Sequence, residues 1–133
     1  MPYRLIEHTA DLCFEVTAGS YPELLAESLQ AMTAWTCPVW GSVCAERRFS
    51  VEAPDRSALL VDLLNEALTL SQIHREAYDR LRFATIGDRR VEGFFLGRAI
   101  SGAADEIKAV TYHGAKVEQH ADGCWSAIIL MDI

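Results

Sequence analysis

Residues 124–133 read CWSAIILMDI, an apolar run that ends in an acidic residue. Such a run is typical of a buried strand. It stops at Asp132 and Ile133, where a side-chain carboxylate adjoins the last carboxylate of the sequence. The dipeptide Asp122-Gly123 that precedes the run is a strong hairpin signal. We therefore predict that this strand folds back on the segment Ala109–Tyr112.

The length of that turn decides which residue lies opposite Asp132. A two-residue turn at Asp122-Gly123 pairs Asp132 with His113, and a four-residue loop pairs it with Thr111. A shift of register by two residues leaves the side chains on the same face of the sheet. The sequence therefore predicts that Asp132 shares a sheet end and a face with Thr111 and His113.

Hydrophobic periodicity predicts two helices. The first runs from Tyr21 to Ala34, with Ser20 as its N-cap and Glu23 completing a capping box. The second is capped by Asp55 or Ser57 and carries an apolar face over residues 59–68. Further strands are predicted at Leu12–Ala18, Phe49–Ala53, Leu81–Thr85 and Val91–Ile100, and loops at Thr36–Ser42 and Ser101–Asp105.

The second predicted helix also carries a group of polar residues. These are Asp62, Asn65, Glu66 and Thr69. They are interpreted either as a solvated face, as a partner surface or as a buried polar cluster. The sequence leaves these three interpretations open.

The composition is that of a soluble globular protein, and we predict one domain over residues 1–133. Half of the residues are hydrophobic and 23% are charged. No apolar run approaches the roughly 18–20 residues that span a bilayer, and no secretory signal precedes the first predicted strand. We therefore expect a cytoplasmic protein without membrane association, whose four cysteines are reduced.

The formal net charge of −7 argues against a broad phosphate-binding surface, because nucleic-acid affinity comes largely from Lys and Arg contacts to phosphates. Any role in RNA chemistry is therefore expected to run through a protein partner. The chain has two lysines, Lys108 and Lys116. Lys108 is interpreted either as a surface lysine or as a cationic contact to a partner or a phosphate.

Three acidic groups form a candidate cation site, namely Asp11, Asp132 and the carboxylate of Ile133. If they converge at one sheet end, they repel one another unless a cation lies between them. Hard cations such as Ca²⁺ and Mg²⁺ prefer carboxylate, carbonyl and water oxygens. The alternative is that Asp132 is exposed at a ragged end and Asp11 is a turn residue.

Two histidines, His8 and His113, lie near the same predicted strand ends. Each is interpreted either as a hydrogen-bonded structural residue or as a ligand or base. A zinc site from Cys37, Cys44 and two histidines is a further alternative, although the spacing of the cysteines is wrong for a zinc knuckle. The sequence contains no nucleophile elbow and no phosphate-cradling glycine loop, so it makes no case for a self-sufficient enzyme.

Four segments together resemble the archease family. They are HTAD at residues 8–11, LLVDLLNE at 59–66, KAVTYHG at 108–114, and the final Asp132-Ile133. They occur in the family's order and span nearly the whole chain. The resemblance implies an α+β protein, a three-layer sandwich of sheet, helices and sheet, with two main helices and antiparallel or mixed sheets.

The resemblance also implies a function and a set of site residues. Archeases activate the RtcB-type RNA ligase in tRNA splicing and RNA repair, by promoting guanylylation of the ligase and multiple turnover. A metal ion, seen as calcium, would lie on Asp11, Asp132 and Ile133, with Mg²⁺ or Mn²⁺ as alternatives. Lys108 is implicated in activation, and His8 and His113 are further candidates for contact with the partner.

On this interpretation the chain is an activator rather than a catalyst, and it meets RNA only through the ligase. Two alternatives remain. One is a chaperone-like interaction module without a dedicated ligase partner. The other is a metal-dependent hydrolase built on Asp11 and Asp132, which lacks an evident general base beyond His8 or His113.

Overall fold

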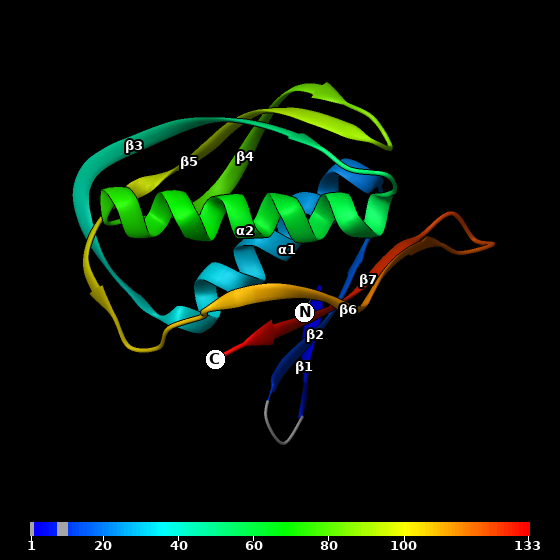
Figure 1. Ribbon diagram of the computed structural model, residues 1–133, viewed down its shortest axis with the longest axis horizontal. Coiled ribbons are helices and arrows are strands. Elements are labelled where there is room, and N and C mark those ends of the chain that lie inside the picture. The colour runs from blue at the N-terminus through cyan, green and yellow to red at the C-terminus, as the bar shows by residue number, and fades with distance from the viewer. Residues whose placement is uncertain (1, 8–10) are drawn as a thin grey trace.

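The computed structural model describes residues 2–7 and 11–133, and Figure 1 shows their arrangement. His8 lies outside the described residues. The two helices are α1 (Tyr21–Thr36) and α2 (Arg56–His74). The strands are β1 (Tyr3–Glu7), β2 (Asp11–Ala18), β3 (Pro38–Glu52), β4 (Glu76–Ile86), β5 (Arg90–Ala103), β6 (Ala109–Gln119) and β7 (Trp125–Asp132).

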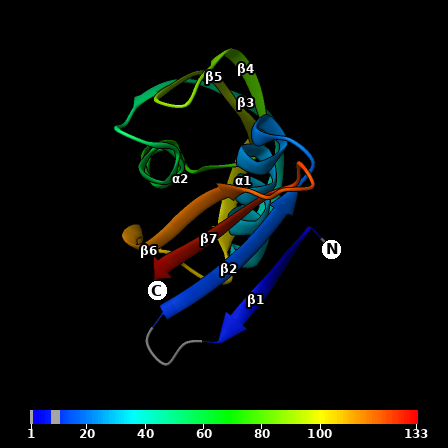
Figure 2. The same ribbon diagram turned by 90° about the vertical axis from the view of Figure 1, so that its right-hand side faces the viewer.

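The elements form three layers, with both helices between two sheets (Figure 2). One sheet has the strand order β1-β2-β7-β6, and the other has the order β3-β5-β4. Every strand pair is antiparallel. The expected α+β sandwich of sheet, helices and sheet is therefore confirmed, and its sheets are antiparallel rather than mixed.

The core lies on both sides of the helix layer, because each sheet turns one apolar face inward. Phe14 on β2, Leu25 on α1, Leu60 on α2 and Phe95 on β5 belong to one buried cluster. No helix among the described residues is long and apolar enough to cross a bilayer.

Both predicted helix starts are confirmed. The Ser20 hydroxyl accepts a hydrogen bond from the Glu23 amide at 3.3 Å, and the Asp55 carboxylate accepts one from the Ala58 amide at 2.8 Å. These side chains satisfy amides of the first turn that have no partner within the helix. The capping box is only partly formed, because the Glu23 carboxylate accepts from the Gly19 amide rather than from Ser20.

Two segments predicted as loops are strands instead. β3 begins at Pro38, and β5 runs on to Ala103, so that Pro38 pairs with Ala103 and Val39 with Gly102. Proline is tolerated there because it is the first residue of an edge strand, where its missing N–H breaks no essential ladder bond. The predictions of loops at Thr36–Ser42 and Ser101–Asp105 were therefore wrong over most of their length.

An ion pair between the partly exposed Arg47 on β3 and the nearly buried Glu76 on β4 joins the two outer strands of the three-stranded sheet. Arg47 donates to both carboxylate oxygens of Glu76 at 2.8 Å, and the Tyr78 hydroxyl donates to the same carboxylate at 2.9 Å. Glu76 is only 8% exposed. The hydrogen bonds from Arg47, and then that from Tyr78, hold the pKa of Glu76 below its usual range.

We expect Glu76→Gln to lower the free energy of unfolding at pH 7 by about 1–2 kcal/mol, because it replaces a charge-assisted hydrogen-bonded pair. Glu76 has a lowered pKa in the folded state, so its contribution is present above the ordinary glutamate pKa of about 4.3 and is lost as the pH falls through the folded value. Urea unfolding of both proteins at several pH values should therefore show a difference that narrows on acidification. A difference that stays constant from pH 7 to pH 3 would contradict this assignment.

Candidate metal and partner site

Asp11 and Asp132 are direct cross-strand partners. Asp11 is the first residue of β2 and Asp132 the last of β7, and the antiparallel register places them opposite each other. Such partners have Cα atoms about 4.5–5.5 Å apart and side chains on one face. Their chain neighbours Leu12 and Met131 are buried in the core, so the two carboxylates lie on the outer face of the sheet.

Lys108 lies at the same end of this sheet. Its backbone amide donates to the carbonyl oxygen of Asp132 at 2.8 Å, and the next residue, Ala109, pairs with Asp132. Ile107 is 2% exposed and anchors the segment in the core, whereas the Lys108 side chain is exposed. Figure 2 shows the start of β2, the end of β7 and the start of β6 at one end of the molecule.

The predicted partners of Asp132 were wrong by two residues for Thr111 and by four for His113, although Thr111 pairs with Leu130 and so lies on the face of Asp132. β6 and β7 are adjacent, as expected, but Asp132 faces Ala109 rather than Thr111 or His113. The register shifts between Thr111 and Lys116, where Gly114 takes a φ of 70°. His113 therefore lies four residues along β6 from the partner of Asp132, roughly 13 Å for an extended strand.

The turn explains part of this error. Gln119 pairs with Trp125, so five residues separate the paired positions instead of two or four. The Gly123 amide donates to the His120 carbonyl at 2.9 Å, and Gly123 takes a φ of 90°. Asp122-Gly123 is thus in the turn, as predicted, but as part of a longer one.

Two polar residues of α2, whose role the sequence left open, position β6. The Asn65 side chain donates to the Val110 carbonyl at 2.8 Å and accepts from the Val110 amide at 2.9 Å. Asp62 accepts a hydrogen bond from the Tyr112 hydroxyl, which raises the pKa of that tyrosine. Because β6 is an edge strand, Asn65 takes the place of a neighbouring strand and holds the segment that begins with Lys108.

The outer-face carboxylates have the chemistry of a hard-cation site. Among the described residues, no basic side chain forms an ion pair with Asp11 or Asp132. Like charges directly opposite each other in a sheet are destabilising, and a cation between them would reverse that effect. All-oxygen donors of this kind fit Ca²⁺ better than a softer metal.

The donor set is small. Within residues 2–7 and 11–133 no three His, Cys, Asp or Glu side chains gather as a metal cluster. Asp11 and Asp132 provide two carboxylates, and Ile133, 48% exposed, adds main-chain oxygens beside them. Because Ca²⁺ takes six to eight oxygen ligands, the remaining ones would come from water or from a partner molecule.

These observations describe a class of protein: an α+β sandwich that presents an acidic pair and a lysine at one exposed sheet end. The chain belongs to the archease family. The family model described as "Archease protein family (MTH1598/TM1083)" matches residues 3–133. The protein archease of Methanosarcina acetivorans is 32% identical, over 98% of this chain and 95% of the relative. That of Methanopyrus kandleri is also 32% identical, over the full length of both chains.

Solved structures agree with this assignment. A crystal structure from Thermotoga maritima, described as an archease and possible chaperone, matches with a TM-score of 0.69 and 25% identity, over 96% of this chain and 94% of the other. The solution structure of protein 1598 from Methanobacterium thermoautotrophicum matches with a TM-score of 0.75, over 99% of both chains. At 20% identity, the second likeness shows the shared fold alone.

Proposed function

We propose that this archease is a metal-binding, cytoplasmic activator of an RtcB-type RNA ligase in tRNA splicing and RNA repair, and that it acts by promoting guanylylation of the ligase and multiple turnover. The observation that carries the proposal is the cross-strand pairing of Asp11 with Asp132, beside Lys108, in a member of this family. Lys108 and Asp132 are exposed at this sheet end, and none of Asp11, Lys108 and Asp132 forms an ion pair with another described residue.

Asp11, Asp132 and Ile133 would hold the ion, with calcium favoured by the oxygen donors and Mg²⁺ or Mn²⁺ as alternatives. When bound, the cation would neutralise the carboxylates and present a positive centre to phosphate oxygens. The Asp132 carbonyl accepts a hydrogen bond from the Lys108 amide, which fixes the backbone of Lys108 beside the acidic pair. His113 lies farther along β6 and would contact the partner at the edge of this surface.

Lys108 supplies an exposed positive charge next to the acidic pair. Its side chain is exposed, while Ile107 and the Asn65 clamp on Val110 fix the backbone on either side. A fixed backbone with a free ammonium group suits contact with a phosphate or with an acidic group of the ligase, because phosphoryl transfer depends on positioning and charge neutralisation.

The test is a multiple-turnover ligation assay with an RtcB-type ligase and a sub-stoichiometric amount of this protein. We expect the wild-type protein to raise the number of turnovers, and Asp132→Asn and Lys108→Ala each to reduce that stimulation by about tenfold or more, because loss of a charged interface contact typically costs several kcal/mol.

Lys116→Ala is the matched control. Lys116 is the other lysine of the chain, lies on β6, the strand that begins directly after Lys108, and pairs with Glu118 at 3.3 Å. Its replacement removes the same charge from the same sheet without touching the Asp11–Asp132 end. If Asp132→Asn and Lys108→Ala both stimulated ligation at the wild-type level, the proposal would be wrong.

A chaperone-like interaction module is the second candidate, because the related Thermotoga structure is described as a possible chaperone. Large exposed apolar side chains include Val39, Val43 and Ile73. On this alternative, the protein would capture many unrelated unfolded clients and suppress their aggregation. A pull-down that recovers a ligase, and no broad set of clients, favours the activator.

A further inference from the structure

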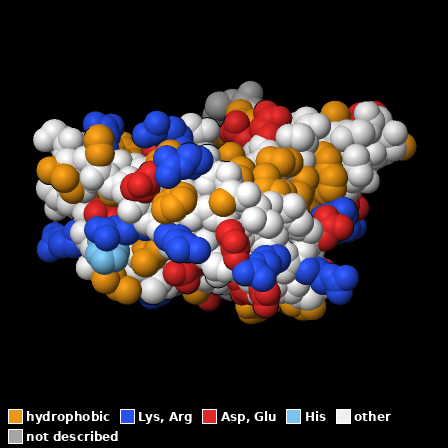
Figure 3. Space-filling view, turned by 90° about the horizontal axis from the view of Figure 1, so that it is seen from above, with side chains coloured by type: hydrophobic (Ala, Val, Ile, Leu, Met, Phe, Trp, Pro, Cys, Tyr) orange, Lys and Arg blue, Asp and Glu red, His pale blue; other side chains and the backbone are white. Residues whose placement is uncertain are grey.

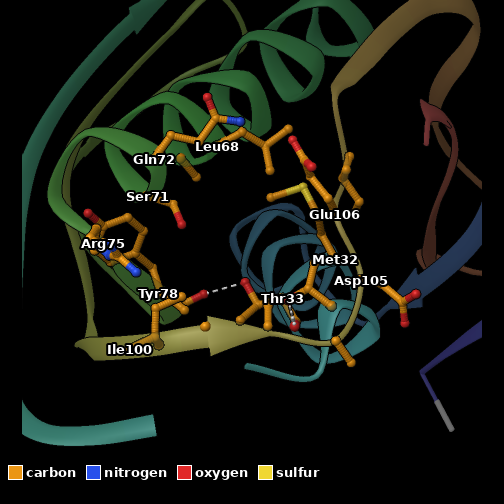
Figure 4. Close-up of a pocket in the computed structure, with 17 residues that line it drawn as sticks. Met32, Thr33, Leu68, Ser71, Gln72, Arg75, Tyr78, Ile100, Asp105 and Glu106 are labelled. Atoms are coloured by element: carbon orange, nitrogen blue, oxygen red, sulfur yellow. Dashed lines mark hydrogen bonds between the residues drawn. The ribbon is translucent and has the colours of Figure 1, made fainter. Parts of the chain in front are cut away.

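A cavity of about 580 Å³ opens between the C-terminal halves of α1 and α2. Its other walls are the start of β4 and the segment 100–107 (Figure 4). A volume of this size is typical of pockets that take small molecules. Neither the acidic pair nor the Lys108 side chain lines it.

The lining includes a largely apolar wall. Met32, Tyr78 and Ile107 are each 2% exposed or less, and they lie beside Leu68 and Ala77. In Figure 4 the side chains of Met32 and Leu68 point toward the hollow from the two helices. An apolar wall of this kind holds the hydrocarbon part of a ligand.

The hydroxyl groups of the cavity can only accept hydrogen bonds from a ligand, because their own protons are used. Thr33 donates to the Tyr78 carbonyl at 2.6 Å and Thr36 to the Thr33 carbonyl at 2.7 Å, and Ser71 donates to the Glu76 carbonyl. Each oxygen keeps lone pairs for a further donor. The polar part of the cavity is therefore rich in acceptors.

Two helix C-termini add negative potential at the same place. α1 ends at Thr36 and α2 at His74, and each is followed by a left-handed cap residue, Cys37 or Arg75. The C-terminus of a helix carries a partial negative charge and favours cations. The Glu106 carboxylate stands at the rim in Figure 4, whereas Asp105 is turned away from the hollow.

Arg75 opposes the negative potential of the cavity, because it carries a positive charge and is one of the lining residues. Within the described residues the Arg75 side chain forms no ion pair, and it is exposed to solvent, which screens its charge. Thr33 is buried and Thr36 and Ser71 are half-buried, so these three hydroxyl oxygens are less screened by water than the exposed Arg75 guanidinium group.

We infer that this cavity binds a small organic ammonium ion, an amine carried on an apolar body. The ammonium group would donate to the hydroxyl oxygens of Thr33, Thr36 and Ser71, the Glu106 carboxylate at the rim would add a favourable charge, and the apolar body would pack on Met32 and Leu68. This site goes beyond the proposed ligase activation and does not depend on it.

The test is a titration of the isotopically labelled, calcium-free protein with the 2-phenylethylammonium ion at pH 7, followed by amide NMR shifts. The comparison ligand is 2-phenylethanol, which has nearly the same shape and no charge. We expect saturable shifts at Ser71, Gln72 and Ile107 with both probes, and a dissociation constant about tenfold lower for the ammonium ion, because charge-assisted hydrogen bonds are the stronger ones.

Glu106→Gln should weaken binding of the ammonium ion severalfold and leave the alcohol unchanged, since Glu106 is exposed and its replacement leaves the packing intact. Glu27→Gln, the same charge change on α1 but outside the cavity lining, should affect neither probe. Equal affinity for the two probes would overturn the preference for a cation. Saturable shifts elsewhere, or none, would overturn the site.

Discussion

Calcium should raise the free energy of unfolding of the wild-type protein by about 2.7 kcal/mol when its free concentration is about 100 times the dissociation constant. For a chain of this length, that corresponds to a rise in Tm of roughly 10 °C. Asp132→Asn should remove nearly all of this gain, because it takes away one of the two paired carboxylates. The readout is thermal unfolding followed by circular dichroism, with and without calcium.

The same variant should behave in the opposite way without metal. Asp11 and Asp132 are then like charges directly across a strand pair, and removal of one charge should stabilise the calcium-free protein by about 0.2–1 kcal/mol. A change of sign between the two conditions is a signature that a merely structural role for Asp132 would not produce. Asp11→Asn should show the same pattern, because the two side chains are equivalent in the pair.

Glu118→Gln is the control for this measurement. Glu118 lies on β6 of the same sheet, is paired with Lys116 at 3.3 Å, and is far along the strand from Ala109. It changes the net charge by the same amount, so it reports any general effect of charge on calcium binding. If Asp132→Asn and Glu118→Gln kept the same calcium-dependent rise in Tm as the wild-type protein, the ion would have to bind elsewhere.

Features that depend on neighbours in the sequence could be predicted, because their physical causes are local. Ser20 and Asp55 cap helices through amides three residues away, and the alternation from Leu12 to Ala18 follows from one buried face. The start of β3 at Pro38 could not be predicted in the same way. Its strand character comes from pairing with Ala103, far along the chain, and not from its own propensity.

The candidate site also has parts that could be predicted from the sequence and parts that could not. Two arguments predicted that Asp11 and Asp132 lie together, namely the repulsion of converging carboxylates and the family pattern. The register of β2 with β7 places the two residues opposite each other. The predicted position of His113 was wrong because the register of β6 shifts around Gly114. A glycine within a strand can mark a bulge, but the sequence does not give the number of residues by which the register moves. The Asn65 clamp on Val110 was missed because it joins a helix to an edge strand.

Gly97→Ala should destabilise the protein by about 3 kcal/mol or more, since overpacking that forces backbone to move is costly. A Cβ atom at Gly97 would clash with the Ala77 carbonyl oxygen and would lie 2.8 Å from the Tyr78 Cα atom. Gly97 lies on β5, the central strand of its sheet, so β4 would have to move away. That movement would disturb Tyr78, whose carbonyl accepts from Thr33 at 2.6 Å.

Substitutions at two other glycines of β5 serve as comparisons, and the measurement is urea unfolding of all three variants at pH 7. Gly93→Ala should also destabilise strongly, because its Cβ would clash with the Arg82 carbonyl oxygen. Gly102→Ala should change the free energy of unfolding by less than about 0.5 kcal/mol, because no atom lies within 4 Å of the added methyl group. The order of the three variants in free energy of unfolding shows whether the cost comes from the close approach of β4 or from alanine at any position of this strand. A Gly97→Ala protein as stable as Gly102→Ala would show that β4 and β5 are farther apart than their register and bulges require.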